Sequence, residues 1–134
     1  MEETKIVVDS CVDFNEDTKD FARVPFRILI DDEEIVDSDL DQDELISKMK
    51  KTKNQIKTAC PPPEDFMNKF NEYKNIFAVA ISDQLSGSYN SAVLALNILK
   101  EKFPDKFVHI FDSKTAATGE TLIALKVKQL MEQN

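Results

Sequence analysis

A series of short apolar runs, each followed by a longer segment of mixed character, is the feature that most constrains the fold. The runs span residues 5–9, 24–30, 76–82 and 107–112. Continuous apolar runs of this length are typical of strands in a parallel sheet, because helices cover both of its faces. A polar turn after the second run predicts a short hairpin arm over residues 34–36.

Helices are predicted for the intervening segments. They span residues 15–21, 41–51, 62–73, 88–102 and 119–132, most of them with apolar residues on one side. Asp41 suits an N-cap and Pro62 suits a first helical turn. The alternation predicts an α/β fold with a mainly parallel sheet flanked by helices on both faces. The chain has no linker-like tract, so we expect one domain over residues 1–134.

Composition excludes several functional classes. The chain has 17 basic and 25 acidic residues, a net charge of −8, so we expect no nucleic-acid partner. The longest apolar run, residues 76–81, is far shorter than the about 20 residues of a membrane span. The absence of a signal-like N-terminus and the presence of only two cysteines predict a cytoplasmic protein. With one histidine, a zinc site would need carboxylates at two positions, and we expect no metal and no cofactor.

Polar and small residues gather where the predicted strands end. Asp-Ser pairs follow the first and last runs, at residues 9–10 and 112–113, and Ser10 is thereby a candidate site residue. The chain has only two glycines, Gly87 and Gly119, and both lie near predicted helix starts. Such positions share the carboxyl edge of a parallel sheet, where ligands bind. Tight turns also favour these residue types for structural reasons, so each pair alone is weak evidence.

Two segments carry the best candidates for an anion site. Ser86, Gly87 and Ser88 open a helix, whose free N–H groups and partial positive charge attract a carboxylate or phosphate. Thr58 and Cys60 precede three consecutive prolines, which stiffen the backbone and can hold the Thr58 hydroxyl on a rigid loop.

These segments together resemble the DegV family of bacterial fatty-acid-binding proteins. The matching motifs are Ile6-Val7-Val8-Asp9-Ser10, Val24-Pro25-Phe26, Thr58-Ala59-Cys60-Pro61, Leu85-Ser86-Gly87-Ser88-Tyr89 and Phe111-Asp112-Ser113-Lys114. The chain departs from the family pattern in three ways. Ala59 and Cys60 replace the Ser-Gln of a Thr-Ser-Gln-Pro motif, and Ser88 replaces the Thr of Ser-Gly-Thr. We also expect the second, C-terminal domain that family members carry to be missing.

The resemblance implies a binding function without catalysis. Family members bury the acyl tail of one long-chain fatty acid and hold its carboxylate with the two motifs. Carried over, the carboxylate contacts are Thr58 and Ser86, with Gly87 and Ser88 completing the turn and Ser10 and Cys60 nearby. Some members present the carboxylate to a fatty acid kinase, which makes an acyl-phosphate for phospholipid synthesis.

The absent domain affects the expected affinity. A buried acyl chain gains about 0.8 kcal/mol per methylene, so it needs a deep apolar tunnel. We therefore expect that this chain binds fatty acid weakly, closes its site as a homodimer, or is a fragment with an exposed apolar face.

Three other functions remain open from the sequence. A protein-interaction module with a vestigial lipid site would use the acidic stretch at 31–44 and the basic cluster at 48–57. A phospho-receiver domain would use Asp9 and Lys114, although its expected acidic pair and acceptor aspartate are not evident. A thiol enzyme would need Cys11 or Cys60 near His109, which lies inside a predicted strand.

Overall fold

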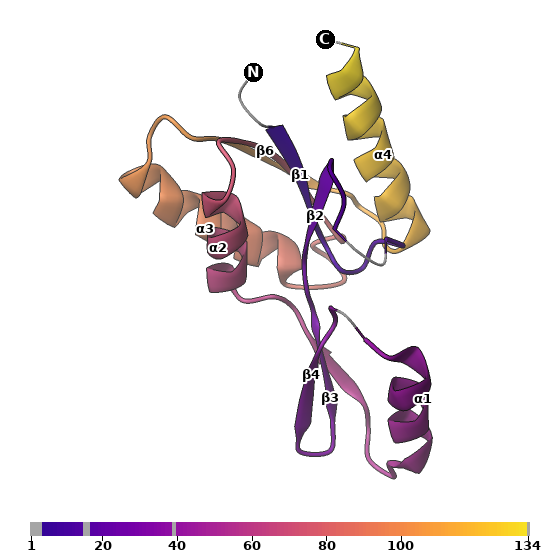
Figure 1. Cartoon of the computed structure of the whole chain (residues 1–134). Coiled ribbons are helices and arrows are strands. Elements are labelled where there is room, and N and C mark those ends of the chain that lie inside the picture. The colour runs from indigo at the N-terminus through magenta and orange to yellow at the C-terminus, as the bar shows by residue number, and fades with distance from the viewer. Residues whose placement is uncertain (1–3, 15–16, 39, 134) are drawn as a thin grey trace.

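The computed structural model of the protein describes residues 4–14, 17–38 and 40–133. The elements follow one another as β1 (Thr4–Asp9), β2 (Phe21–Val24), β3 (Arg27–Ile30), β4 (Glu33–Val36), α1 (Gln42–Lys51), β5 (Lys57–Ala59), α2 (Pro63–Asn71), β6 (Asn75–Ala80), α3 (Ser88–Lys102), β7 (Phe107–Asp112) and α4 (Thr118–Glu132). Figure 1 shows their arrangement. Within the described residues, no helix is both long enough and apolar enough to span a membrane.

Four strands form a parallel sheet in the order β2-β1-β6-β7. Val7 of β1 packs with residues of α2 and α3 on one face, whereas Ile6 and Val8 pack with residues of α4 on the other. The helices accordingly lie on opposite sides of the sheet in Figure 1. Burial on both faces explains the continuous apolar character of the strands and confirms the predicted α/β fold.

A second, antiparallel sheet has the order β4-β3-β5. The hairpin arm predicted over residues 34–36 is confirmed as β4, which pairs with β3, whereas the separate sheet and its third strand, β5, were not predicted. This sheet projects below the parallel sheet in Figure 1, with α1 beside it. The Asp41 side chain caps α1 as expected by accepting hydrogen bonds from the backbone N–H groups of Asp43 and Glu44. Within α1, all of whose residues the structure describes, no residue is buried. The chain enters this part of the molecule after β2 and leaves it between β5 and α2.

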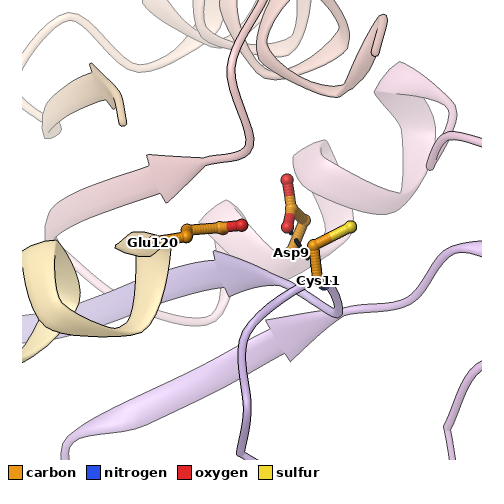
Figure 2. Close-up of side chains that lie close together, drawn as sticks. All are labelled: Asp9, Cys11 and Glu120. Carbon is orange, nitrogen blue, oxygen red and sulfur yellow. Dashed lines mark hydrogen bonds between the residues drawn. The ribbon is translucent and has the colours of Figure 1, made fainter. Parts of the chain in front are cut away.

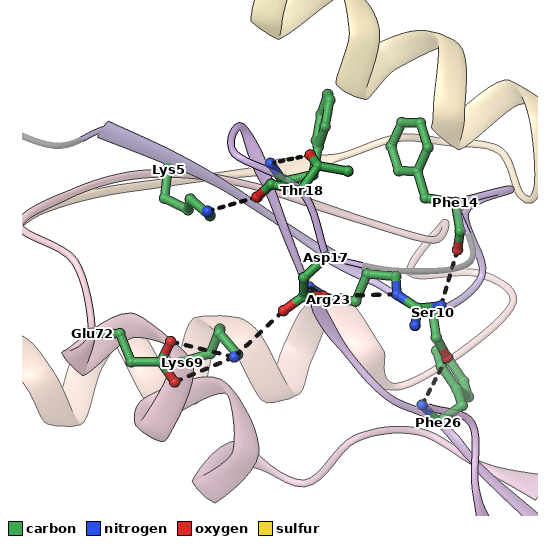
Figure 3. A network of polar contacts seen from close by, with 10 residues as sticks. Lys5, Ser10, Phe14, Asp17, Thr18, Arg23, Phe26, Lys69 and Glu72 are labelled. Carbon is green, nitrogen blue, oxygen red and sulfur yellow. Dashed lines mark hydrogen bonds and ion pairs between the residues drawn. The ribbon is translucent and has the colours of Figure 1, made fainter. Parts of the chain in front are cut away.

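The prediction of one strand over residues 24–30 is wrong. The run is divided between two sheets, because Val24 ends β2 and Arg27 begins β3. Pro25 has no N–H group to donate to a sheet, and it lies where the chain leaves one sheet for the other. The next N–H group, that of Phe26, donates to the Ser10 hydroxyl at 2.9 Å (Figure 3).

The predicted helix over residues 15–21 is also wrong where it can be compared. Residues 15 and 16 lie outside the described part, residues 17–20 are not helical, and Phe21 begins β2. Polar contacts fix this segment instead (Figure 3): Lys5 Nζ donates to the Thr18 carbonyl at 2.9 Å, and the Arg23 N–H donates to Asp17 at 2.9 Å. The segment over 57–59, expected as a stiff loop, forms β5.

Candidate functional site

A pocket of about 630 Å³ lies between the small sheet and the β6–α3 loop. Its volume is within the range of about 300–1,000 Å³ that is usual for small-molecule sites. Four predicted site residues line it: Thr58, Cys60, Ser86 and Gly87. They come from two segments that are far apart in the sequence, so the fold brings the two predicted motifs to one cavity.

The rest of the pocket wall is mostly apolar. Phe26, Ile28, Ile81 and Leu85 all contribute to it, and Leu85 leaves 66% of its surface exposed at the rim. Asp37 also lines the pocket and gives it one acidic side chain among the described lining residues. Hydroxyl groups next to an apolar wall suit a ligand with a polar head and a hydrocarbon part.

Gly87 allows the two motifs to approach each other closely. A Cβ atom at this position would lie 3.2 Å from Cys60 Sγ, which is tight for such a contact. The backbone angles of Gly87, φ −77° and ψ 0°, are accessible to other residues, so close approach is the reason for glycine here. Ser86 Oγ accepts a hydrogen bond from the Ser88 N–H at 3.2 Å and keeps its own proton for another acceptor.

Ser88 and Ser10 do not appear among the residues that line the pocket. The Ser88 side chain is fully buried, and its hydroxyl donates to Asp9 Oδ2 at 2.7 Å. Ser10 Oγ accepts from the Phe26 N–H at 2.9 Å. Both hydroxyls therefore join loops around the pocket, and direct contact of either with a ligand stays a prediction.

Asp9 forms the polar centre of this edge of the sheet. Its carboxylate accepts hydrogen bonds from the Ile81 N–H at 2.9 Å and the Cys11 N–H at 3.2 Å, in addition to that from Ser88. The side chain is fully buried. The aspartate predicted at the end of the first strand thus fixes the start of the β6–α3 loop, which carries Ser86.

Glu120 lies close to Asp9 and was not anticipated (Figure 2). It belongs to the first turn of α4 and is fully buried. Burial, followed by the nearby charge of Asp9 and a side-chain hydrogen bond with it, raises the pKa of Glu120 to about 10. Burial and neighbouring acids also raise the pKa of Cys11 to about 12. An acidic residue in a first helical turn is ordinarily explained by the helix dipole, so Glu120 could not be singled out from its position in the sequence.

The second Asp-Ser pair forms a separate polar cluster. Asp112 Oδ1 accepts from the Asp83 and Lys114 N–H groups, and Lys114 Nζ lies 2.8 Å from Asp112 Oδ2. Burial opposes ionisation of Asp112, but hydrogen bonds from Lys114 and Asp83 outweigh it and lower its pKa to about 2. A Cβ atom on Gly119 would overlap the Thr115 side chain, so this glycine serves packing. These residues are absent from the described lining of the pocket.

Comparison with known proteins assigns the family. A family model described as "Uncharacterised protein, DegV family" matches residues 3–134. The chain belongs to the DegV family. A DegV domain-containing protein of Streptococcus pneumoniae is 38% identical over 135 residues, which cover 96% of this chain and 48% of that protein. The chain therefore spans about half the length of the curated DegV relatives that it matches.

Solved DegV structures have the same fold. A DegV family protein from Ruminococcus gnavus, refined with vaccenic acid, is 40% identical with a TM-score of 0.92, over 100% of this chain and 50% of that one. The Streptococcus pneumoniae fatty acid kinase (Fak) B3 protein, loaded with linoleic acid, is 38% identical with a TM-score of 0.90, over 97% and 48% of the two chains.

Proposed function

We propose that this DegV chain binds a long-chain fatty acid, with the carboxylate held by the hydroxyls of Thr58 and Ser86. The observation that carries the proposal is that both residues line the same pocket. Hydrogen bonds from hydroxyl groups stabilise a carboxylate, each by about 1.5–3 kcal/mol. Gly87 is the N-cap of α3, so the positive end of the helix dipole adds to the attraction.

The two ends of the ligand have different places in this proposal. Asp37 is negatively charged and lines the pocket, so it disfavours a carboxylate beside it. The head group therefore belongs at the Ser86 turn. The hydrocarbon tail lies along the apolar wall of Phe26, Ile28 and Leu85.

The relatives support this choice of ligand. The protein from Ruminococcus gnavus was refined with vaccenic acid, and the Streptococcus pneumoniae protein was loaded with linoleic acid. The latter is described as a fatty acid kinase B3 protein. We extend both properties to this chain as proposals: it carries a fatty acid in the cytoplasm and presents the carboxylate to a fatty acid kinase, without catalysing a reaction itself.

Exposure of Leu85 indicates how complete the site is. Leu85 leaves 66% of its surface exposed, so the pocket is open to solvent at this point and would not cover the tail of a bound fatty acid. The missing wall would come from the other half that the relatives have, or from a second copy of this chain. We therefore propose that the 134-residue chain alone binds fatty acid weakly.

Native mass spectrometry of the protein purified from bacteria tests the proposal. Because the proposed binding by this chain alone is weak, we expect a complex with the mass of one fatty acid to form when oleate is titrated into the delipidated protein, whether or not a fatty acid co-purifies with it. If no complex of that mass forms before delipidation or during an oleate titration, the proposal is wrong.

The interaction-module alternative receives no comparable support. Lys48 of the basic cluster lies 2.6 Å from Glu33 and 3.1 Å from Glu44 of the acidic stretch. The two stretches thus neutralise each other in part within the chain, as expected for a solvated surface.

A further inference from the structure

Three side chains with metal-binding atoms meet at the carboxyl end of β1 (Figure 2). Asp9 ends the strand, Cys11 follows two residues later, and Glu120 comes from the first turn of α4. One oxygen of each carboxyl group and the sulfur of Cys11 all lie within 4.8 Å of one another. No metal was expected, because the chain has only one histidine; the cluster contains no histidine, and two of its three donors are carboxyl groups.

Glu120 is the residue that points to a ligand. Its side chain is fully buried, and neither of its oxygens accepts a hydrogen bond from a donor among the described residues. The group that it meets is the carboxyl group of Asp9, with which it can form a hydrogen bond only when one of the two is protonated. Figure 2 shows its carboxyl group directed at that of Asp9. A buried carboxyl group without hydrogen-bond donors is costly, so a group of this kind requires an explanation.

A proton gives an incomplete explanation. Protonated Glu120 can donate to Asp9, which then satisfies one oxygen of Glu120. The second oxygen still lacks a donor, and the nearby thiol of Cys11 has no part in the arrangement. The charges that act on Cys11 are those of Asp9, Glu120 and Asp37, which are all acidic. A cation complements all of these features.

We propose that Asp9, Cys11 and Glu120 bind one divalent cation of the zinc class. Thiolate, together with carboxylate oxygens, favours zinc over magnesium and calcium, which take oxygen ligands. Three protein ligands leave a fourth position for water or another donor. This site does not depend on the proposed fatty-acid function.

The surroundings meet two further requirements of a metal site. Asp9 is held in place by the Ile81 N–H and the Ser88 hydroxyl, and such outer contacts orient a ligand. Cys11 lines the 630 Å³ pocket, which gives a cation a route to the cluster from solvent. Binding would displace the protons of Cys11 and Glu120, so affinity should decrease as pH falls.

Titration with Co²⁺ alone tests the proposal. The 134-residue protein is freed of metal with a chelator, kept reduced with a phosphine and titrated at neutral pH. We expect a thiolate-to-cobalt charge-transfer band that Zn²⁺ abolishes by competition. Cys11→Ser should remove the band, whereas the matched variant Cys60→Ser should keep it. Glu120→Gln, which keeps the size of the side chain, should weaken Zn²⁺ binding at least about tenfold.

Three results would overturn the proposal. The first is a wild-type protein without a charge-transfer band, and this result is decisive even if a variant fails to fold. The second is an unchanged band in Cys11→Ser. The third is wild-type Zn²⁺ affinity in Glu120→Gln, in which case a shared proton is the remaining account of this residue.

Discussion

The Ser88 hydroxyl donates a 2.7 Å hydrogen bond to Asp9 Oδ2 and thereby joins the start of α3 to the end of β1. Both side chains are fully buried. Removal of this donor leaves a desolvated carboxylate with fewer partners. We predict that Ser88→Ala lowers the free energy of unfolding by about 1.5–3 kcal/mol, as measured by urea denaturation.

Ser91→Ala is the control for this measurement. Ser91 lies in the same helix and is only half-buried. The same chemical change there should alter the free energy of unfolding by less than about 0.5 kcal/mol. Equal losses of unfolding free energy in the two variants would show that the hydrogen bond from Ser88 to Asp9 contributes no more to stability than an ordinary surface hydroxyl.

The contact between Gly87 and Cys60 supports a prediction about pocket width. A Cβ atom at Gly87 would lie 3.2 Å from Cys60 Sγ, so Gly87→Ala must push the two loops apart or move the thiol. We predict weaker oleate binding for Gly87→Ala in a titration, with little loss of stability because its φ of −77° suits alanine.

Addition of Cys60→Ala should restore binding in the Gly87→Ala background, because the shorter side chain removes the tight contact. A double-mutant cycle measures this recovery as an interaction energy between the two positions. Additive effects of the two substitutions would contradict the steric explanation.

Much of the fold could be predicted, because burial on both faces leaves a local pattern. The apolar run at 107–112 and the helical spacing at 88–102 match β7 and α3. The strands of the second sheet have a weaker pattern in the sequence than those of the parallel sheet. β5 has only three residues, and Pro25 within a continuous apolar run was compatible with one strand as well as two. The division between sheets depends on distant pairing, which the local sequence does not specify.

The candidate site was predicted where residue type and loop position coincide. Thr58 and Ser86 belong to segments with stiff or helix-starting character, and both line one pocket. The partners of Ser88 and the burial of Glu120 could not be predicted in the same way. They result from packing of α3 and α4 against the end of β1, between residues up to about a hundred positions apart.

The assignment of the head group leads to a prediction for a double variant. Thr58→Val with Ser86→Ala removes two hydroxyls that line the pocket. At about 1.5–3 kcal/mol for each hydrogen bond to a charged group, oleate affinity should fall at least about 100-fold. Isothermal titration calorimetry on delipidated protein measures this change.

The matched control makes the same two chemical changes outside the pocket. Thr52→Val with Ser47→Ala lies at α1 and should leave oleate affinity unaltered. If the variant with both Thr58→Val and Ser86→Ala keeps its fold by circular dichroism and its oleate affinity is unchanged, the carboxylate is bound by other residues.

The ion cluster at the end of β7 predicts a change of stability with pH. Hydrogen bonds from Lys114 and Asp83 overcome the effect of burial and lower the pKa of Asp112 from 3.8 to about 2. The folded state therefore favours the ionised form, and this contribution is present above about pH 4 and lost as pH falls to about 2. Urea denaturation of the wild type and Asp112→Asn should show a difference in unfolding free energy that shrinks over this range. Because other carboxyl groups titrate in both proteins, only the difference reports Asp112, and a difference that stays constant down to pH about 2 would contradict the role of Lys114 and Asp83.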